Sequence, residues 1–448
     1  MDNYLFKDFE GVSPTAWKQK IQVDLKGADY NDTLLWKTNE GITVKPFYAK
    51  EDRTHQIVNL PKKGFAICQS IIVSNEKEAN ALAIDAVERG ASAIEFLIKE
   101  KIDFKVLLNG INFQETYIYF KLEFLDASFV SEVSNYTNSS KVFFNNDIIG
   151  KLASTGNWYQ NLKDDHSELE NIIKNNNSLA INVSIYQNAG ANCTQQLAYA
   201  LAHANEYLNH FGGEVASKIH FNFSVGSNYF FEIAKLRAFR ILWSSLLKEY
   251  KVEKTEAHIF AQPSLRNKTL YDYNVNMLRT TSECMSAILG GSNTVSNVAY
   301  DRIFHSSNEF GERISRNQLL TLQQESYLSE AQHFANGTYY IEALTDQLAE
   351  KALEIFKLIE QAGGFLNQLK EGVIQRKIKE SATKEQEQFD NGELVLLGTN
   401  KIQNEKDRMK NDLEVNPFVK VRNQKTLIEP IIQKRLAEKL EQERLDHE

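Results

Sequence analysis

Cysteine is scarce in this chain, and its spacing does not suit a zinc site. The 448 residues include only three cysteines, Cys68, Cys193 and Cys284, which lie far apart and form no C-x-x-C pair. This pattern excludes a disulfide framework and a conventional zinc site. It is typical of a reducing compartment, so we expect a cytoplasmic protein.

Long apolar runs and an excess of basic charge are also missing. No run of about 18 apolar residues occurs, and the N-terminal stretch MDNYLFKDFEGVSPTAWKQKIQVDL lacks the apolar core of a signal peptide. We therefore expect a protein that is neither exported nor embedded in a membrane. Because 51 Lys and Arg residues stand against 59 Asp and Glu residues, for a net charge of −8, we expect no binding of nucleic acid or anionic lipid.

Motifs for phosphate and metal chemistry are absent as well. The sequence has no G-x-x-x-x-G-K-[ST] and no G-x-G-x-x-G, and none of its nine histidines forms H-x-x-x-H. We interpret the histidines as satisfied or solvated side chains and predict no metal site. Gly290 and Gly291 are interpreted as the cap of a helix rather than as part of a ligand loop.

The chain does have a regular alternation of apolar strands and amphipathic helices. Eight runs rich in β-branched and aromatic residues are candidate strands: 65–73, 93–98, 117–125, 141–147, 178–186, 218–226, 256–264 and 292–298. Between most of them, apolar residues recur at helical spacing, as in TQQLAYALAHANEYLNHF. Such alternation indicates an α/β protein with a parallel sheet, and eight repeats predict a (β/α)8 TIM barrel. A doubly wound open sheet is the structural alternative.

The barrel is expected over residues 61–400, with an extension at each end. Residues 1–60 form an N-terminal arm without barrel periodicity, which either wraps a second subunit or packs on its own barrel. Residues 401–448 are expected to form a C-terminal helical tail, because charge alternates at helical spacing near the end. NGELVLLGTNK (391–401) is a candidate hairpin or single strand, and the connections 99–116 and 126–140 are unclear.

A barrel of this class places its functional groups at the carboxyl ends of its strands, which form the barrel mouth. The candidate mouth residues facing a substrate or cofactor are Tyr186, Asn188, Gln262, Asn293 and Glu325. Amides and hydroxyls dominate the strand ends, whereas proton transfer near neutral pH requires a suitable titratable group. We interpret Asp147, the nearest carboxylate, as a helix cap.

Several segments resemble the acyl-CoA-binding barrel of the adenosylcobalamin-dependent methylmalonyl-CoA mutases. They are AGANCTQQLAYALAHANEYL, YFFEIAKLRAFRILW, NMLRTTSECMSAILGGSNTVS, ERISRNQLLTLQQES and NGTYYIEALTDQLAEKALEIFKLIEQAGGF. Their order and spacing match the family from about residue 178 to about residue 400. The resemblance implies a barrel through which coenzyme A passes along the axis, with cobalamin docked on the mouth.

The sequence departs from the family pattern at the positions where the family has its catalytic residues. When VSIYQNAGA is laid on the family's SGYHxxEAGA, Ile185 takes the place of the catalytic histidine and Asn188 that of the glutamate. The family's GGTQSLHTN appears as GGSNTVSNV, with Asn293 at the glutamine position and Ser296 at the histidine position. DPWGGSY has become HFANGTYY. We therefore expect no catalytic residue, with Ile185 and Ser296 as degenerate positions.

The cobalamin motif of the family is not reproduced. The family's cobalamin-binding domain carries D-x-H-x-x-G, whose histidine is the lower ligand of cobalt. Here Asp164 and His166 stand in D-x-H order, but Leu169 replaces the glycine. Only about 50 residues follow residue 400, fewer than a small domain requires. We expect this chain to bind no adenosylcobalamin through a domain of its own.

The resemblance thus implies a non-catalytic small (beta) subunit of a heterodimeric methylmalonyl-CoA mutase. The assembled enzyme would interconvert (R)-methylmalonyl-CoA and succinyl-CoA by radical rearrangement, and the large (alpha) subunit would bind most of the adenosylcobalamin. The alternative is an active subunit that binds acyl-CoA and works with a separate cobalamin-binding polypeptide, which leaves Ile185 and Ser296 unexplained. A third interpretation, an unrelated barrel with a neutral ligand, rests only on the amide-rich mouth.

Overall fold

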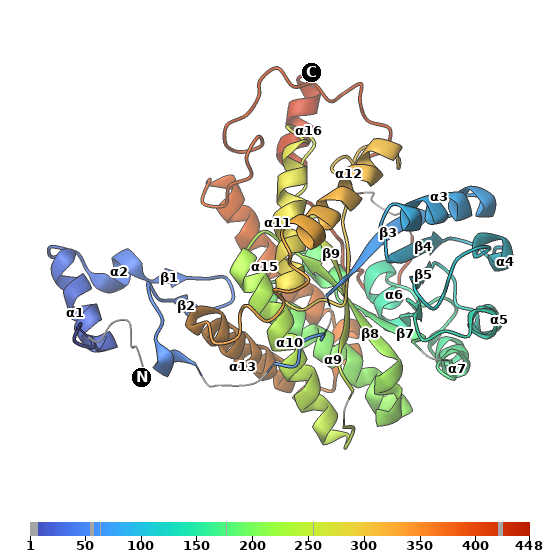
Figure 1. Cartoon of the computed structure of the whole chain (residues 1–448), viewed down its shortest axis with the longest axis horizontal. Helices are drawn as coiled ribbons and strands as arrows, with labels where there is room; N and C mark the ends of the chain where they lie inside the picture. The colour runs from blue at the N-terminus through green and yellow to red at the C-terminus, as the bar shows by residue number, and fades with distance from the viewer. Residues whose placement is uncertain (1–7, 54–57, 63, 176, 254, 420–423) are drawn as a thin grey trace.

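Eight parallel strands lie at the centre of the molecule, surrounded by helices (Figure 1). This computed structural model describes residues 8–53, 58–62, 64–175, 177–253, 255–419 and 424–448. The strands are β3 (Ala66–Ile72), β4 (Ala93–Ile98), β5 (Tyr117–Leu122), β6 (Val142–Phe144), β7 (Leu179–Asn182), β8 (Ile219–Val225), β9 (His258–Pro263) and β10 (Thr294–Ser296). Each lies within one of the eight runs that the sequence predicts as strands.

Backbone hydrogen bonds close this sheet into a barrel. Its strand order is β6-β5-β4-β3-β10-β9-β8-β7, so β6 and β7 are the two ends. The Phe144 N–H donates to the carbonyl of Asn177, and the Ala180 N–H donates to the carbonyl of Asn146, each over 2.9 Å. These bonds join the two ends, and the predicted (β/α)8 barrel is confirmed.

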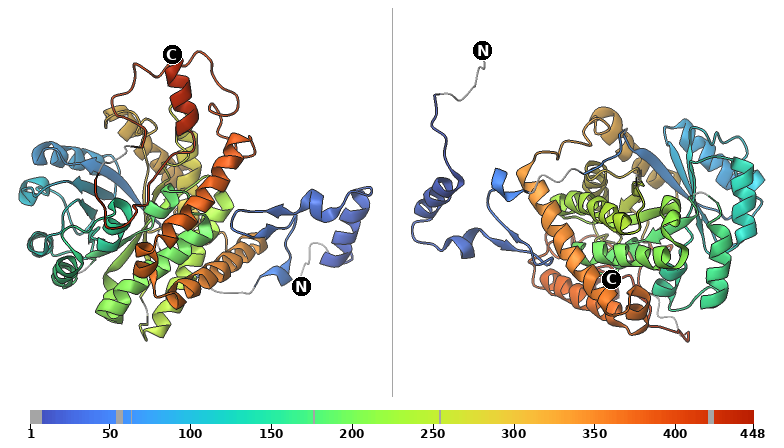
Figure 2. Two further views of the ribbon diagram at one scale, coloured as in Figure 1. Left: turned by 180° about the vertical axis from the view of Figure 1, so that it is seen from behind. Right: turned by 90° about the horizontal axis from the view of Figure 1, so that it is seen from below.

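Helices follow most strands and form the outer layer. They are α3 (Glu76–Glu88), α4 (Phe104–Leu107), α5 (Ala127–Thr137), α6 (Ile148–Thr155), α7 (Leu162–Ile172), α8 (Ser184–Asn188), α9 (Cys193–Phe211), α10 (Tyr229–Glu249), α11 (Val275–Leu289) and α12 (Glu309–Leu320). After a short π-helix, η3 (Thr321–Glu325), α13 (Tyr339–Gln361) packs across α9 and α10 (Figure 2). Among the described residues, no helix is both long and apolar enough to span a membrane.

The structure shortens one predicted strand and resolves the two connections that the sequence left unclear. The run 178–186 is strand only as far as Asn182, because Val183 already has helical backbone angles and the chain turns into α8. The unclear connection 99–116 contains only the four-residue helix α4, whereas 126–140 contains the eleven-residue helix α5.

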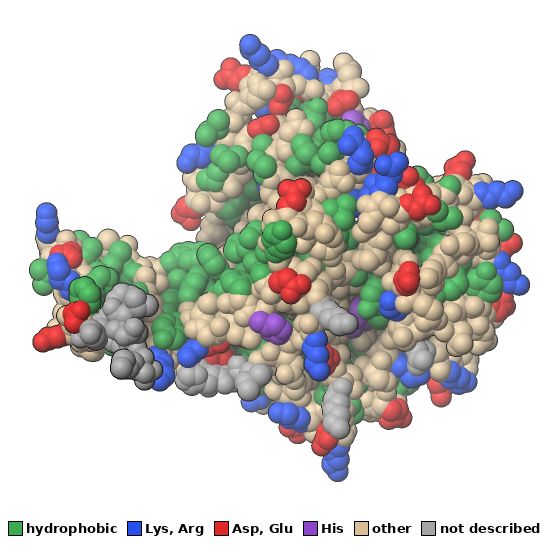
Figure 3. Space-filling view, viewed as in Figure 1, with side chains coloured by type: hydrophobic (Ala, Val, Ile, Leu, Met, Phe, Trp, Pro, Cys, Tyr) green, Lys and Arg blue, Asp and Glu red, His purple; other side chains and the backbone are tan. Residues whose placement is uncertain are grey.

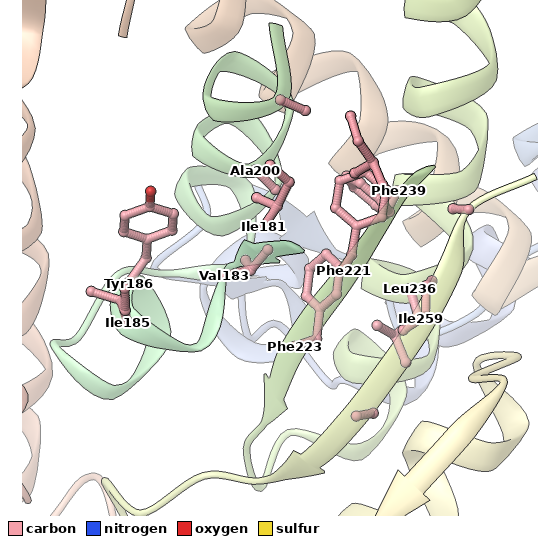
Figure 4. Packing of buried hydrophobic residues seen from close by; sticks show 14 of the residues in the cluster. Ile181, Val183, Ile185, Tyr186, Ala200, Phe221, Phe223, Leu236, Phe239 and Ile259 are labelled. Atoms are coloured by element: carbon pink, nitrogen blue, oxygen red, sulfur yellow. The ribbon is translucent and has the colours of Figure 1, made fainter. Parts of the chain in front are cut away.

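The main core lies between the sheet and the helices. Side chains alternate along a strand, so Phe221 of β8 faces the helices while its neighbours His220 and Asn222 face the axis. The Phe221 ring lies 4.5 Å from that of Phe239 on α10 (Figure 4). It also lies 5.0 Å from the ring of Trp243 on the same helix. Burying one such phenylalanine contributes about 1.5–3 kcal/mol to folding.

The N-terminal arm projects from the barrel (Figures 1 and 2). It consists of α1 (Pro14–Asp24), α2 (Tyr30–Leu34) and the hairpin of β1 (Trp36–Lys37) and β2 (Thr43–Val44). Helix α1 buries none of its side chains. Residues 1–7 and 54–57 of the predicted arm lie outside the described residues.

The region after the barrel is less regular than the sequence predicts. Helix α14 (Phe365–Lys370) and helix α15 (Val373–Asp390) follow α13, but 391–401 forms neither hairpin nor strand, and its residues Leu397 and Lys401 make an isolated bridge. In the described parts of 401–437 there is no helix, and the predicted helical tail is helical only in α16 (Glu438–Asp446). Within the described part of the preceding segment, residues 427–436 lie against the barrel, where backbone N–H groups donate to carbonyls near α6, α8 and β9.

Candidate functional site

Five rings fill the middle of the barrel. They point inward from four strands and form what we call the axial plug: Tyr119, Phe143, His220, His258 and Phe260. The centroid of the Phe143 ring lies 4.9 Å from that of Tyr119 and 4.4 Å from that of His258. The Phe260 ring meets Tyr119 edge-on at 4.9 Å. With Tyr119 fully buried and Phe260 2% exposed, the barrel interior is packed at this level, as in most barrels.

Hydrogen bonds hold the plug in place. The Tyr119 hydroxyl lies 2.8 Å from Nε2 of His258 and 2.7 Å from Oγ1 of Thr294. The Nε2–H of His220 donates to the side-chain oxygen of Asn145 over 2.6 Å. Burial lowers the pKa of both His220 and His258 to about 3, so both imidazoles are neutral at pH 7. They act as fixed hydrogen-bonding groups of the interior.

A cavity of about 290 Å³ lies at the barrel mouth, next to Phe260 of the plug. Each of the six strands β4 to β9 contributes one polar side chain to its lining, from the strand itself or from the residue that follows it. These residues are Glu95, Lys121, Asn145, Asn182, Asn222 and Gln262. Gln262, one of the residues that the sequence places at the mouth, is among these lining residues. The volume of the cavity is close to the lower end of the range of about 300–1,000 Å³ that is typical of sites for drug-sized ligands.

The two degenerate positions are buried and carry no imidazole. Ile185 is 2% exposed and belongs to the core between the sheet and the helices (Figure 4). Ser296 ends β10 inside the barrel, where its hydroxyl lies 3.0 Å from that of Ser70, which donates to Glu95 over 2.6 Å. Neither position offers an imidazole that could protonate a thioester, and the Ser296 hydroxyl is hydrogen-bonded within the barrel wall.

Two further predicted mouth residues, Tyr186 and Asn188, lie in the corner after β7. Tyr186 faces the helices, and Asn188 lies at the carboxyl ends of the strands. The fully buried Tyr186 points its hydroxyl to within 2.8 Å of Nδ1 of His203 on α9, so its predicted position facing the mouth is wrong. Asn188 accepts hydrogen bonds from the Ser264 hydroxyl and the Leu265 N–H, each over 3.0 Å, and its amide donates to Ser224 over 3.2 Å. These bonds tie together the carboxyl ends of β7, β8 and β9, so Asn188 fixes the rim of the mouth.

Two predicted mouth residues lie at the opposite end of the barrel. Asn293 precedes β10, and its side-chain oxygen accepts from Arg240 and from the N–H of Ile259, near the start of β9, each over 2.9 Å. Glu325 ends η3 and is exposed, and the nearby Gln323 donates to the carbonyl of Phe65, just before β3. The resemblance aligns these residues with positions of the family, but it does not show at which end of the barrel they lie.

Asp147 is a helix cap, as predicted. It precedes α6 and accepts from the N–H of Gly150 over 2.8 Å. The same carboxylate oxygen lies 2.9 Å from Nε2 of His203 and accepts from the Tyr207 hydroxyl over 2.9 Å. Burial alone would raise the pKa of Asp147, but His203 and the hydrogen bonds hold it below its ordinary value. This buried cluster joins α6 to α9, and the second carboxylate oxygen of Asp147 accepts from the N–H of Asn182 over 2.9 Å.

The D-x-H pair does not form a cobalt ligand set. Asp164 and His166 lie in the first turns of α7, and Nδ1 of His166 is 2.7 Å from the carbonyl oxygen of Leu162. Leu169 is fully buried in the core. Across the described part of the chain, no group of three His, Cys, Asp or Glu side chains is arranged to hold a metal ion. These residues do not fit the lower-ligand role that the motif has in cobalamin domains.

Sequence reasoning missed the axial plug. Its residues lie in strands that are apolar on both faces, such as YIYFKL (117–122), so the sequence does not indicate which face points to the axis. The large rings two residues apart, at Tyr117 and Tyr119 and at His258 and Phe260, were the available signal.

Comparison with known proteins identifies the family. The family model of methylmalonyl-CoA mutase matches residues 98–446. The "Methylmalonyl-CoA mutase small subunit" of Porphyromonas gingivalis is 34% identical, over 89% of this chain and 71% of the relative. The methylmalonyl-CoA mutase of Cereibacter sphaeroides is 27% identical over 86% of this chain, which spans 64% of that relative, and the Escherichia coli enzyme is 33% identical over 55% of this chain and 36% of its own length. This chain belongs to the methylmalonyl-CoA mutase family.

Proposed function

We propose that this chain is the non-catalytic small subunit of a heterodimeric methylmalonyl-CoA mutase in the cytoplasm. The assembled enzyme would interconvert (R)-methylmalonyl-CoA and succinyl-CoA. Adenosylcobalamin would supply the radical chemistry and would be held mainly by the large subunit. This chain would contribute a stable barrel and an interface to its partner.

The axial plug is the observation that carries this proposal. The family resemblance implies that coenzyme A passes along the barrel axis, but here Tyr119, Phe143 and Phe260 pack against one another on that axis. A barrel interior is normally filled by side chains and has to be emptied before it can pass a ligand. On this proposal, acyl-CoA is not a ligand of this barrel.

The two degenerate positions support the same conclusion. Ile185 is buried in apolar surroundings, and Ser296 hydrogen-bonds within the barrel wall. Losing one preorganised donor at a reacting carbonyl typically lowers the rate by about 10²–10³-fold. Losing both would leave too little catalysis to sustain an active site, whereas a supporting subunit has no need of either.

The arm provides a surface for the partner. Helix α1 has no buried residue, while Trp17 is 50% exposed and Val23 is 72% exposed. Figure 3 shows hydrophobic side chains on the surface of the arm. An isolated helix shorter than about 12–15 residues is marginal in water, so packing against another surface would stabilise it. We assign this surface to the contact with the large subunit.

The alternative is an active acyl-CoA-binding subunit that works with a separate cobalamin-binding polypeptide. It requires coenzyme A to enter the barrel, and it offers no role for the packed rings or for Ile185. Binding of coenzyme A by this chain alone, at the micromolar concentrations typical of enzyme substrates, would favour it.

Co-purification tests the proposed partnership. The chain is expressed together with a methylmalonyl-CoA mutase large subunit, with an affinity tag on one of the two, and the complex is sized by light scattering. The proposal predicts a stable complex with one copy of each chain. Failure of the two chains to associate at micromolar concentration would remove the partner and contradict the proposal.

A further inference from the structure

The cavity at the barrel mouth has no task in the proposed function, yet several polar groups in its wall are unpartnered. Asn222 of β8 is 8% exposed and faces the axis. Its amide nitrogen reaches the cavity and has no hydrogen-bond partner among the described residues. A buried amide without a partner is costly, so this one indicates a ligand or solvent that accepts its hydrogen bond.

Gln262 has the same feature on the neighbouring strand β9. Its side chain is half-buried in the cavity wall, and neither its oxygen nor its nitrogen bonds to any residue that the structure describes. In Asn145 and Asn182 only the side-chain oxygen is used, accepting from His220 and from Ser184 respectively. The cavity thus offers amide donors from four adjacent strands and a free amide oxygen.

Opposite charges balance in this cavity. Glu95 is 5% exposed, accepts from the Ser70 hydroxyl over 2.6 Å and forms no ion pair in the described chain. Lys121 lies at the rim, where it is exposed. A second carboxylate and a second ammonium, those of Glu123 and Lys151, also line the cavity. Because both signs are present, a ligand with a net charge meets repulsion as well as attraction.

A neutral ligand with several hydroxyls matches this wall. A hydroxyl both donates and accepts, so it can bond to a free amide nitrogen and to the Glu95 carboxylate. The third carboxylate in the lining, Asp147, is already used, because both of its oxygens accept from backbone N–H groups. The ring of Phe260 completes the lining and offers an apolar surface to the C–H groups of such a ligand.

We propose that the mouth cavity binds a small neutral polyol or monosaccharide. The amide groups of Asn222 and Gln262 would donate to its oxygens, and Glu95 would accept from one of its hydroxyls. Polar groups placed in this way fix the orientation of a ligand in a concave site. The site requires neither mutase activity nor a partner, so its failure would leave the proposed function intact.

Isothermal titration calorimetry of the full chain with D-glucose, sorbitol and myo-inositol tests this site. At least one of these neutral probes should bind in a saturable way at millimolar concentration, with one site per chain. Glucosamine and gluconate are matched charged probes, because they add an ammonium to the glucose skeleton and a carboxylate to that of sorbitol. Each should bind more weakly than its neutral counterpart. Absence of saturable binding by all three neutral probes, or equal or tighter binding of a charged one, would overturn the proposal.

Two variants of nearly the same shape locate the binding. Gln262→Leu removes an amide that bonds to no described residue, so the fold should be retained and the affinity should fall about tenfold, equivalent to one good hydrogen bond. Asn222→Leu should weaken binding to a similar extent. Gln361→Leu, at the exposed end of α13, should leave the affinity unchanged. Thermal unfolding without ligand checks the fold of each variant. Unchanged affinity in both Gln262→Leu and Asn222→Leu would place the ligand elsewhere and contradict the proposal.

Discussion

The hydroxyl of Tyr119 lies 2.8 Å from Nε2 of His258 and is fully buried on the barrel axis. The same oxygen is 2.7 Å from the Thr294 hydroxyl, so one phenol connects β5, β9 and β10 through the barrel interior. In a protein of this family, the axis is where the resemblance implies a passage for coenzyme A. The Tyr119–His258 contact belongs to the hydrogen-bonded, packed interior of this barrel.

Tyr119→Phe should destabilise the protein by about 1–3 kcal/mol, because it leaves His258 and Thr294 buried without their shared partner. Urea unfolding at pH 7 measures the change. Tyr117→Phe is the matched control, since Tyr117 lies on the same strand and is only partly buried. An equal loss in both variants would show that the buried Tyr119 hydrogen bonds contribute no more to stability than the hydroxyl of the partly buried Tyr117.

Phe143→Ala should lower the free energy of unfolding by about 3–5 kcal/mol, because it empties the centre of the plug. Its ring packs against Tyr119 and His258, which have no other way to fill the space. Phe310→Ala, at a side chain that is 47% exposed, should change stability by less than about 0.5 kcal/mol. A small effect of Phe143→Ala in chemical denaturation would mean that the axis is loosely packed.

Stability should fall as the pH drops below the ordinary histidine range. The folded protein holds His220 and His258 at a pKa of about 3, whereas unfolded histidines titrate near 6.5. Between these values the unfolded chain binds more protons, so the free energy of unfolding decreases as the pH falls.

His220→Gln should remove about 1.4 kcal/mol per pH unit from this slope, equivalent to one proton. Urea unfolding from pH 7 to pH 4.5 gives the slope for the wild type, for His220→Gln and for the control His447→Gln on the exposed tail. The slope should flatten in His220→Gln only. An unchanged slope would mean that His220 is already protonated in the folded protein.

Trp17→Ser combined with Val23→Ser should weaken association with the large subunit by at least about tenfold, because apolar anchors carry much of the energy of an interface. The stability of the isolated chain should not change, since α1 buries none of its side chains. Leu278→Ser, at a residue on α11 that is 71% exposed, controls for the loss of surface hydrophobicity. Affinities are measured by surface plasmon resonance, and unaltered binding would remove the arm from the interface.

Ile185→His should restore no turnover. The position is 2% exposed in apolar surroundings, so the imidazole should destabilise the fold by about 1–3 kcal/mol. A variant that folds would still have serine in place of the second histidine, at Ser296, and would still have the axial plug, so we expect no turnover from it. Isomerase activity of the purified variant, assayed with adenosylcobalamin and methylmalonyl-CoA, would contradict the structural interpretation of this corner.

The sequence predicted the barrel well because all eight strands are marked by apolar, β-branched runs between amphipathic helices. It predicted the direction of side chains less well. Tyr186 faces α9 because β7 ends at Asn182 and the chain becomes helical at Val183. The sequence pattern predicted a strand through residue 186, and in a continued strand the Tyr186 side chain would point in a different direction. Asn293 lies at the amino-terminal end of the barrel because it directly precedes β10, and its place at the start of the run 292–298 could have indicated this.

Turnover without the large subunit tests the central claim most directly. Conversion of (R)-methylmalonyl-CoA to succinyl-CoA is measured with adenosylcobalamin for this chain alone, for this chain with an isolated cobalamin-binding domain, and for this chain with the large subunit. Because the axis is packed and Ile185 and Ser296 carry no imidazole, we predict turnover only when the large subunit is present. Turnover by this chain with the isolated cobalamin-binding domain would contradict the account.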